Sequence, residues 1–147
     1  MDNLKLENQL CFPIYLTAKE LTRIYDKYLK ELNLTYTQYI VMMYFWDKKN
    51  SNVKELSRTL ILDPSTLTPL LIKLENKGFI RREKSNQDER NLNITLTKAG
   101  ENLKEQAKLI PKKAGKCVGL DIEESKKLYE LIYKVLNNIL KEEENGS

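Results

Sequence analysis

Residues 63–78 constrain the fold most strongly, because their apolar side chains recur with the period of an α-helix. Asp63 is a good N-cap, Pro64 suits the first helical position, and Gly78 suits the residue just past the end. Leucines stand at i, i+3, i+4 and i+7, so one face is predicted to lie in a core; they are Leu67, Leu70, Leu71 and Leu74. Short or charged polar side chains point the other way, and these are Ser65, Thr66, Thr68 and Lys73.

A basic β-hairpin is predicted directly after this helix. Arg81, Arg82 and Lys84 follow Ile80, and after a polar tip at 85–90 the apolar residues Leu92, Ile94 and Leu96 alternate as in a strand. Before the helix, residues 50–52 are predicted as a loop, with Asn52 as the N-cap of a short helix at 53–60. A helix with small polar side chains beside a cationic ribbon is typical of DNA reading through both grooves. The sequence predicts a winged helix-turn-helix, mainly α with a small β-hairpin.

The charge is concentrated on the same segment. Residues 48–98 hold 11 Lys/Arg and 6 Asp/Glu, whereas the remaining residues hold 14 and 15. This excess fits contact with phosphates, although a solvated charged face is the alternative interpretation.

Helices are also predicted at 13–32, after the capping residues Thr35 and Thr97, and after Asp121. The last helix carries a wide apolar stripe: Leu128, Leu131, Ile132, Val135, Leu136, Ile139 and Leu140. This stripe exceeds what one small chain needs, so we expect a homodimer. We expect one domain over 1–147, with a DNA-reading head at about 48–98 and dimerisation helices at about 4–34 and 98–141. Residues 142–147 are expected to be disordered.

Several classes of function are disfavoured by what the sequence lacks. It has no histidine, no glycine-rich phosphate loop, and two cysteines too far apart for a usual metal-ligand spacing. We therefore expect no metal, no cofactor and no enzyme activity. No apolar run approaches the roughly 20 residues of a membrane span, and the first residues lack a signal-peptide pattern. We expect a cytoplasmic protein.

The order of elements, with Asp88 and Arg90 spaced as Asp-x-Arg in the hairpin, resembles the MarR family of bacterial transcription regulators. The resemblance covers residues 4 to about 140. Four stretches resemble the branch of organic hydroperoxide resistance regulators, and these are residues 6–12, 34–39, 62–71 and 88–90. The first is the specific one, because it carries Cys11.

The resemblance implies a dimeric repressor for oxidative stress, in which Cys11 reacts with an organic hydroperoxide and the oxidised dimer releases its operator. In that branch two tyrosines hydrogen-bond the cysteine, and the partners of one cysteine include tyrosines of the other subunit. They would be Tyr25 and Tyr36, with Tyr15 as a nearby third. Cys117 stands about where some members carry a resolving cysteine, and in others a small cellular thiol caps the oxidised sulfur.

The residues around Cys11 give independent support. It lies two positions before Pro13, near a predicted helix N-terminus, whose partial positive charge favours the thiolate that attacks a peroxide. The first product of that attack is a sulfenic acid. The plain alternative is an inert core cysteine among Leu10, Phe12 and Ile14.

The expected DNA is a double-stranded inverted repeat, read by two heads about one helical turn apart. Ser65, Thr66 and Thr68 are expected at bases or phosphates, and Lys73 at the backbone. Arg90 is expected in the minor groove, held in position by Asp88. Lys84 is the last residue that we expect to contact DNA. Three alternatives remain: a MarR-type regulator responding to an aromatic ligand, a thiol peroxidase, and a winged-helix module that binds only protein.

Overall fold

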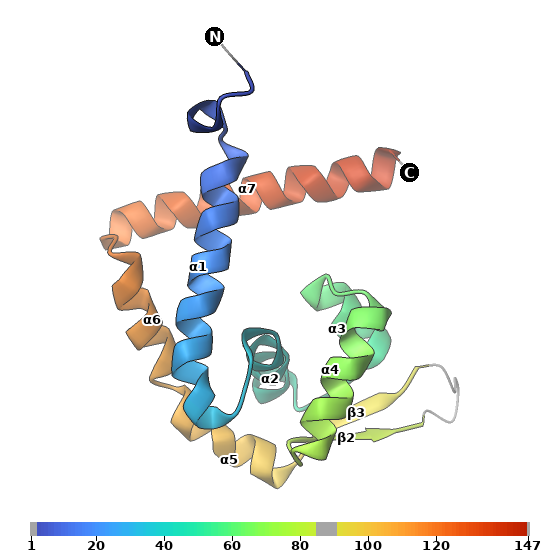
Figure 1. Ribbon diagram of the computed structural model, residues 1–147. Coiled ribbons are helices and arrows are strands. Elements are labelled where there is room, and N and C mark those ends of the chain that lie inside the picture. The colour runs from blue at the N-terminus through green and yellow to red at the C-terminus, as the bar shows by residue number, and fades with distance from the viewer. Residues whose placement is uncertain (1–2, 85–90, 147) are drawn as a thin grey trace. The chain divides into compact units, whose positions relative to one another are not determined.

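The computed structural model describes residues 3–84 and 91–146 (Figure 1). The chain divides into two compact units, residues 1–114 and 115–147. The prediction of one domain over 1–147 stays a prediction. The elements follow the order η1 Leu6–Asn8, α1 Cys11–Leu29, η2 Lys30–Leu32, α2 Tyr36–Lys48, β1 Asn50–Asn52, α3 Val53–Leu60, α4 Pro64–Asn76, β2 Ile80–Glu83, β3 Asn93–Leu96, α5 Lys98–Ala107, α6 Ile110–Val118 and α7 Ile122–Gly146.

The predicted fold class is confirmed, because helices dominate and the hairpin of β2 and β3 is present. The sheet has one strand more than expected. Its order is β1-β3-β2, all antiparallel, and Ser51 of β1 stands opposite Ile94 of β3. Residues 50–52 were predicted as a loop, and that prediction is wrong. Their Asn-Ser-Asn sequence has no strand propensity of its own, so pairing with β3 overrides the local preference.

The core of the first unit lies around α2, α3, α4 and the sheet. Phe45 and Met42 of α2 and Leu56 of α3 are fully buried. The predicted leucine stripe of α4 is buried at all four positions, and Ile80 and Ile94 bring the hairpin into the same cluster. Helix α4 and the hairpin are therefore fixed to one core.

Helix caps account for most of the helix starts. Thr35, Asn52, Thr97 and Asp121 each accept a backbone N–H three residues on, as their positions predicted. Thr35 also closes a full capping box with Gln38. Asp63 occupies the N-cap position of α4, but its side chain makes no cap hydrogen bond.

Two helix ends differ from expectation. α1 begins at Cys11 rather than at Pro13. Pro13 is tolerated in the first turn, because the N–H groups there have no partner within the helix and the missing N–H of proline breaks no hydrogen bond. α7 continues to Gly146, so the prediction of disorder is wrong for residues 142–146.

Among the described residues, no helix has both the length and the apolar character needed to cross a membrane.

Ile61 ends α3 in a left-handed conformation, with φ 54° and ψ 49°. This conformation costs roughly 1 kcal/mol or more for a residue with a Cβ, and Ile61 is also β-branched and largely exposed. We expect Ile61→Gly to raise the free energy of unfolding by about 1 kcal/mol, measured by urea denaturation. Asn33→Gly is the matched control, because Asn33 has φ 56° but asparagine tolerates this region. A lower midpoint for Ile61→Gly would show that the exposed side chain contributes packing that outweighs the strain.

Candidate nucleic-acid interface and thiol site

α4 turns its polar residues outward. Ser65, Thr66, Thr68 and Lys73 are all exposed, while the leucines of the same helix are buried against the core. The structure therefore brings four of the predicted DNA-contacting residues together on one helix surface. Their contact with DNA stays a prediction.

The turn between α3 and α4 is held by Ser57. Its hydroxyl donates to the carbonyl of Leu62, and its own carbonyl accepts the N–H of Leu62 at 3.1 Å. α3 and α4 pack against each other and against α2. The pair forms the predicted helix-turn-helix.

An ion pair fixes the hairpin to the reading helix. The carboxylate of Glu75 in α4 accepts the backbone N–H of Arg82 at 2.9 Å and two guanidinium N–H groups at 3.1 Å. The backbone hydrogen bond from Arg82 and then its side-chain contacts lower the pKa of Glu75. Because both side chains are partly buried, Arg82 is committed to the protein itself. It is thus a poor candidate for phosphate contact.

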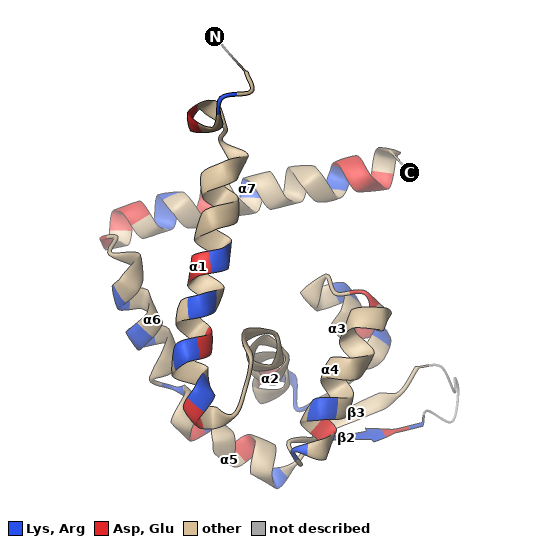
Figure 2. Ribbon diagram, in the orientation of Figure 1, with Lys and Arg blue, Asp and Glu red and all other residues tan. Residues whose placement is uncertain are grey.

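Other cations of the head differ in whether a carboxylate already neutralises them. Arg58 is paired with Glu55, and Lys49 with Glu101. Among the described residues between Val53 and Lys84, four exposed cations have no ion pair with a carboxylate: Lys54, Lys73, Arg81 and Lys84. Figure 2 shows the basic segments of α4 and β2 next to each other. We call these four residues the basic set.

The sequence predicts Lys73 and Lys84 as DNA contacts, but not Lys54 or Arg81. The period of a strand carried the missing information for Arg81, since buried Ile80 and partly buried Arg82 alternate with exposed Arg81. The predicted contacts Asp88 and Arg90 lie outside the described residues.

Cys11 is the first residue of α1 and is exposed. The preceding residue, Leu10, makes no side-chain cap hydrogen bond, so the first N–H groups of the helix are open to a hydrogen-bond acceptor. Tyr15 lies one turn further on the same face and is 63% exposed. Of the three predicted tyrosines, it is the one within reach of Cys11 in the same chain.

Tyr25 and Tyr36 form a ring contact with a centroid distance of 5.0 Å. The ring centroid of Tyr39 lies 6.0 Å from that of Tyr25 and 6.2 Å from that of Tyr36, so the three rings form one cluster. Burial and then the neighbouring Tyr36 raise the pKa of Tyr25, and burial with both neighbours raises the pKa of Tyr39 to about 12. The phenols of Tyr25 and Tyr39 therefore stay protonated near neutral pH and are available as hydrogen-bond donors.

The thiol and this tyrosine pair are far apart within one chain. Cys11 and Tyr25 lie on the same helix, 14 residues apart, which places them about 21 Å apart along its axis. A contact between them therefore requires a second copy of the chain. Cys117 lies near the end of α6 and is also exposed.

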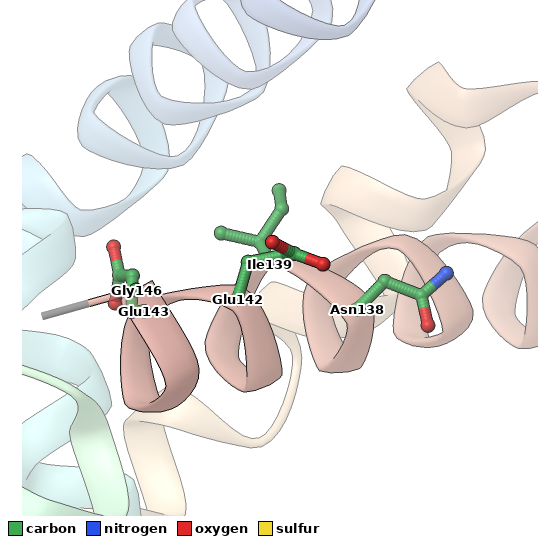
Figure 3. Close-up of a pocket in the computed structure, with 5 residues that line it drawn as sticks. All are labelled: Asn138, Ile139, Glu142, Glu143 and Gly146. Carbon is green, nitrogen blue, oxygen red and sulfur yellow. The ribbon is translucent and has the colours of Figure 1, made fainter.

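The remaining features offer little to a metal or a bound cofactor. The residues described contain no cluster of three or more His, Cys, Asp or Glu side chains that could hold a metal ion. A hollow of about 590 Å³ runs along the end of α7 (Figure 3), but Asn138, Ile139, Glu142, Glu143 and Gly146 all come from that one helix. Because a ligand site normally surrounds most of its ligand, this surface is a poor candidate.

Comparison with known proteins identifies the family. The family model for the transcriptional regulator SarA/Rot matches residues 23–107. The regulator SarZ of Staphylococcus haemolyticus is 42% identical over 133 residues, which is 90% of each chain. The organic hydroperoxide resistance transcriptional regulator of Bacillus subtilis is 40% identical over 141 residues, 94% of each chain.

Solved structures give the same result. Reduced AbfR bound to DNA is 32% identical with a TM-score of 0.78, over 95% of this chain and 97% of that one. Disulfide-formed AbfR is 30% identical with a TM-score of 0.64, over 92% of this chain and 95% of that one. A mutant MarR from E. coli with operator DNA is 27% identical with a TM-score of 0.79, over 86% and 93%. The predicted resemblance is confirmed: the chain belongs to the SarA/Rot family of transcriptional regulators, which are winged-helix proteins of the MarR type.

Proposed function

We propose that this regulator is a homodimeric DNA-binding repressor that releases its operator when an organic hydroperoxide oxidises Cys11. The observation that carries the proposal is the separation of Cys11 from Tyr25 along α1, with Tyr36 of α2 in ring contact with Tyr25. The thiol is exposed at the start of α1, and the paired phenols lie near its other end. Two antiparallel copies of α1 would place the thiol of each against the phenols of the other.

Uncovered apolar surface supports dimerisation. On α1, Tyr15 and Leu16 are exposed, and just before it Leu10 is exposed as well. On α7, none of the described residues is buried, although the stripe predicted from the sequence is apolar. Its members include Leu128, Leu131, Ile132, Val135 and Ile139, all exposed. Monomeric proteins rarely leave so much contiguous apolar surface in water, so we propose that a second copy covers it.

The helix-turn-helix and the basic set support DNA binding. α4 offers Ser65, Thr66 and Thr68 to a major groove, and the basic set provides charges for phosphates. AbfR and MarR are each described in complex with DNA, which supports the same role here. In a two-fold symmetric dimer the two heads would read an inverted repeat about one helical turn apart. Arg90 and Asp88 complete the proposed contacts at the hairpin tip.

Removal of one cation from the basic set gives a direct test of this interface. We expect Arg81→Ala to weaken DNA binding and to lower the slope of log affinity against log salt by about 1.8 per dimer, since each lost phosphate contact contributes about 0.9. Anisotropy titrations at several salt concentrations measure both. Arg23→Ala is the control, because Arg23 is an exposed arginine of α1, outside the reading head. An unchanged slope for Arg81→Ala would remove Arg81 from the interface.

The proposed chemistry begins with the thiolate of Cys11. Its sulfur attacks one peroxide oxygen, an S–O bond forms, and the O–O bond breaks. The alkoxide leaves and takes a proton to become an alcohol, and Cys11 becomes a sulfenic acid. The phenols of Tyr25 and Tyr36 in the second copy would donate hydrogen bonds to the thiolate before the attack.

A second thiol would complete the switch. The thiol of Cys117, or a small cellular thiol, attacks the sulfenic sulfur, and a disulfide and water form. A disulfide-formed structure of AbfR supports this route for the family. The added bulk replaces the Cys11–tyrosine hydrogen bonds and changes the spacing of the two heads. We propose that the chain is a sensor rather than an enzyme, so one equivalent of oxidant per subunit suffices.

Fluorescence anisotropy tests the proposal. The reduced protein is titrated onto labelled DNA from upstream of its own gene, and cumene hydroperoxide is then added. Tight, salt-sensitive binding that is lost at about one equivalent of oxidant per subunit would support it. Binding that survives oxidation would contradict the role of Cys11 and leave DNA binding intact. Consumption of many equivalents with a reductant would instead indicate a peroxidase.

A second candidate signal is an aromatic carboxylate. A hollow of about 500 Å³ lies within the first unit, and Lys27, Lys113 and the acidic Glu31 line it beside apolar residues such as Leu109 and Ile110. Two ammonium groups against one carboxylate, next to apolar side chains, suit an aromatic anion. Salicylate-induced release of DNA, without any response to peroxide, would favour this alternative.

A further inference from the structure

The exposed face of α4 is apolar at its centre. Pro69 and Ile72 are both exposed, and Ile72 leaves 40% of its surface in water. With Ser65 and Thr68 they recur at three- and four-residue spacings, so these four side chains share one face of the helix. The leucine stripe on the other side is buried, so the core does not need this second apolar surface.

The same helix offers few of the side chains that read bases by paired hydrogen bonds. Arginine or lysine typically recognises guanine, and asparagine or glutamine recognises adenine. Between Pro64 and Asn76 there is no arginine or glutamine, the single asparagine is the last residue, and the single lysine, Lys73, belongs to the basic set proposed for phosphates. Glu75 is held by Arg82 and is not available to a cytosine. Hydroxyl groups remain, but they distinguish bases weakly because they both donate and accept.

One base carries an apolar group in the major groove, and that is thymine with its C5-methyl group. On the basis of the proposed DNA-binding function, we infer that Ile72, together with Pro69 and the methyl group of Thr68, contacts thymine methyl groups. These contacts would make thymine the base selected at the centre of each half-site.

A lone exposed isoleucine is ordinary on a protein surface. Ile72 differs because it is next to Lys73 of the basic set, on the helix face that would enter the groove. Docking there removes water from Ile72 whichever bases are present. Only an apolar base group makes that burial favourable, whereas a polar base edge would lose its own hydrogen bonds to water.

Substitution of uracil for thymine in the DNA tests this inference, because it removes the C5-methyl group and keeps the base pair. The upstream fragment is amplified with dTTP or with dUTP, and each product is titrated by anisotropy at fixed salt with the full chain. We expect the wild type to bind the uracil DNA on the order of 10-fold more weakly, from one methyl contact in each of two half-sites.

The variant Ile72→Ala separates this contact from any change in DNA shape. We expect Ile72→Ala to bind both DNAs with nearly the same affinity, while Ile61→Ala, which removes an exposed isoleucine outside α4, keeps the preference for thymine. Full discrimination by Ile72→Ala would overturn the inference. Equal, tight binding of both DNAs by the wild type would overturn it and leave the proposed function intact. Failure to bind either DNA would overturn both.

Discussion

A Cys11→Ser variant is expected to bind the upstream DNA as the reduced wild type does, and to retain that DNA when cumene hydroperoxide is added. Serine keeps the shape of the side chain and a hydrogen-bonding group toward Tyr25 and Tyr36, so the reduced dimer is preserved. Its hydroxyl is a poor nucleophile toward a peroxide, so the S–O bond of the proposed switch has no counterpart. The wild type should lose more than 100-fold in affinity, which corresponds to about 3 kcal/mol. Anisotropy before and after oxidant measures both proteins.

Cys117→Ser is the matched control, since it removes the other exposed thiol of the chain. With a small thiol present it should still respond to the peroxide, and without one its response reports whether Cys117 resolves the sulfenic acid. Release of DNA by oxidised Cys11→Ser would contradict the sensor role of Cys11. The tyrosines can be examined in the same way, because Tyr36→Phe removes the hydroxyl but keeps the ring contact with Tyr25.

The head of the fold was predictable because its signals are local. The caps at Asn52 and Thr97 and the leucine stripe of α4 each need only a few residues of sequence. Gly78 likewise ends the helix region at φ 82°, a conformation that glycine adopts at little cost. Strand β1 was missed because its pairing with β3 joins segments about 40 residues apart and leaves no pattern in the three residues themselves.

The candidate site was predictable to a smaller extent. Residue type identified Ser65, Thr68 and Lys73 as exposed polar groups on α4, and the structure places them there. The role of Arg82 depends on Glu75 across the turn between α4 and β2, so sequence could not separate it from Arg81. Pro69 and Ile72 were not among the predicted contacts, because only polar side chains were considered on the helix face opposite the leucines. The proposed contact of Cys11 with the phenols of Tyr25 and Tyr36 would depend on a second copy of the chain, which the sequence of one chain cannot place.

Gly100→Ala in α5 is expected to cause a large loss of stability. A Cβ at this position would lie 2.2 Å from the carbonyl oxygen of Phe79 and 2.7 Å from Cδ1 of Leu96. The carbonyl of Gly100 also accepts the indole N–H of Trp46 at 2.8 Å in a buried setting. Movement of α5 to relieve the clash would strain that hydrogen bond, so we expect a loss of about 2–4 kcal/mol. Thermal denaturation should show a midpoint lower by on the order of 10 °C.

Gly115→Ala provides the matched control for this result. Gly115 also lies inside a helix, α6, but a Cβ there would meet nothing within 4 Å. Alanine is preferred over glycine in a helix by about 1 kcal/mol, so this variant should be slightly more stable than the wild type. The two substitutions make the same chemical change, and their opposite signs would isolate the contact of α5 with Phe79 as the cause. A Gly100→Ala protein as stable as the wild type would show that the backbone at Phe79 can move at little cost. The hairpin of β2 and β3 would then not be held rigidly against α5.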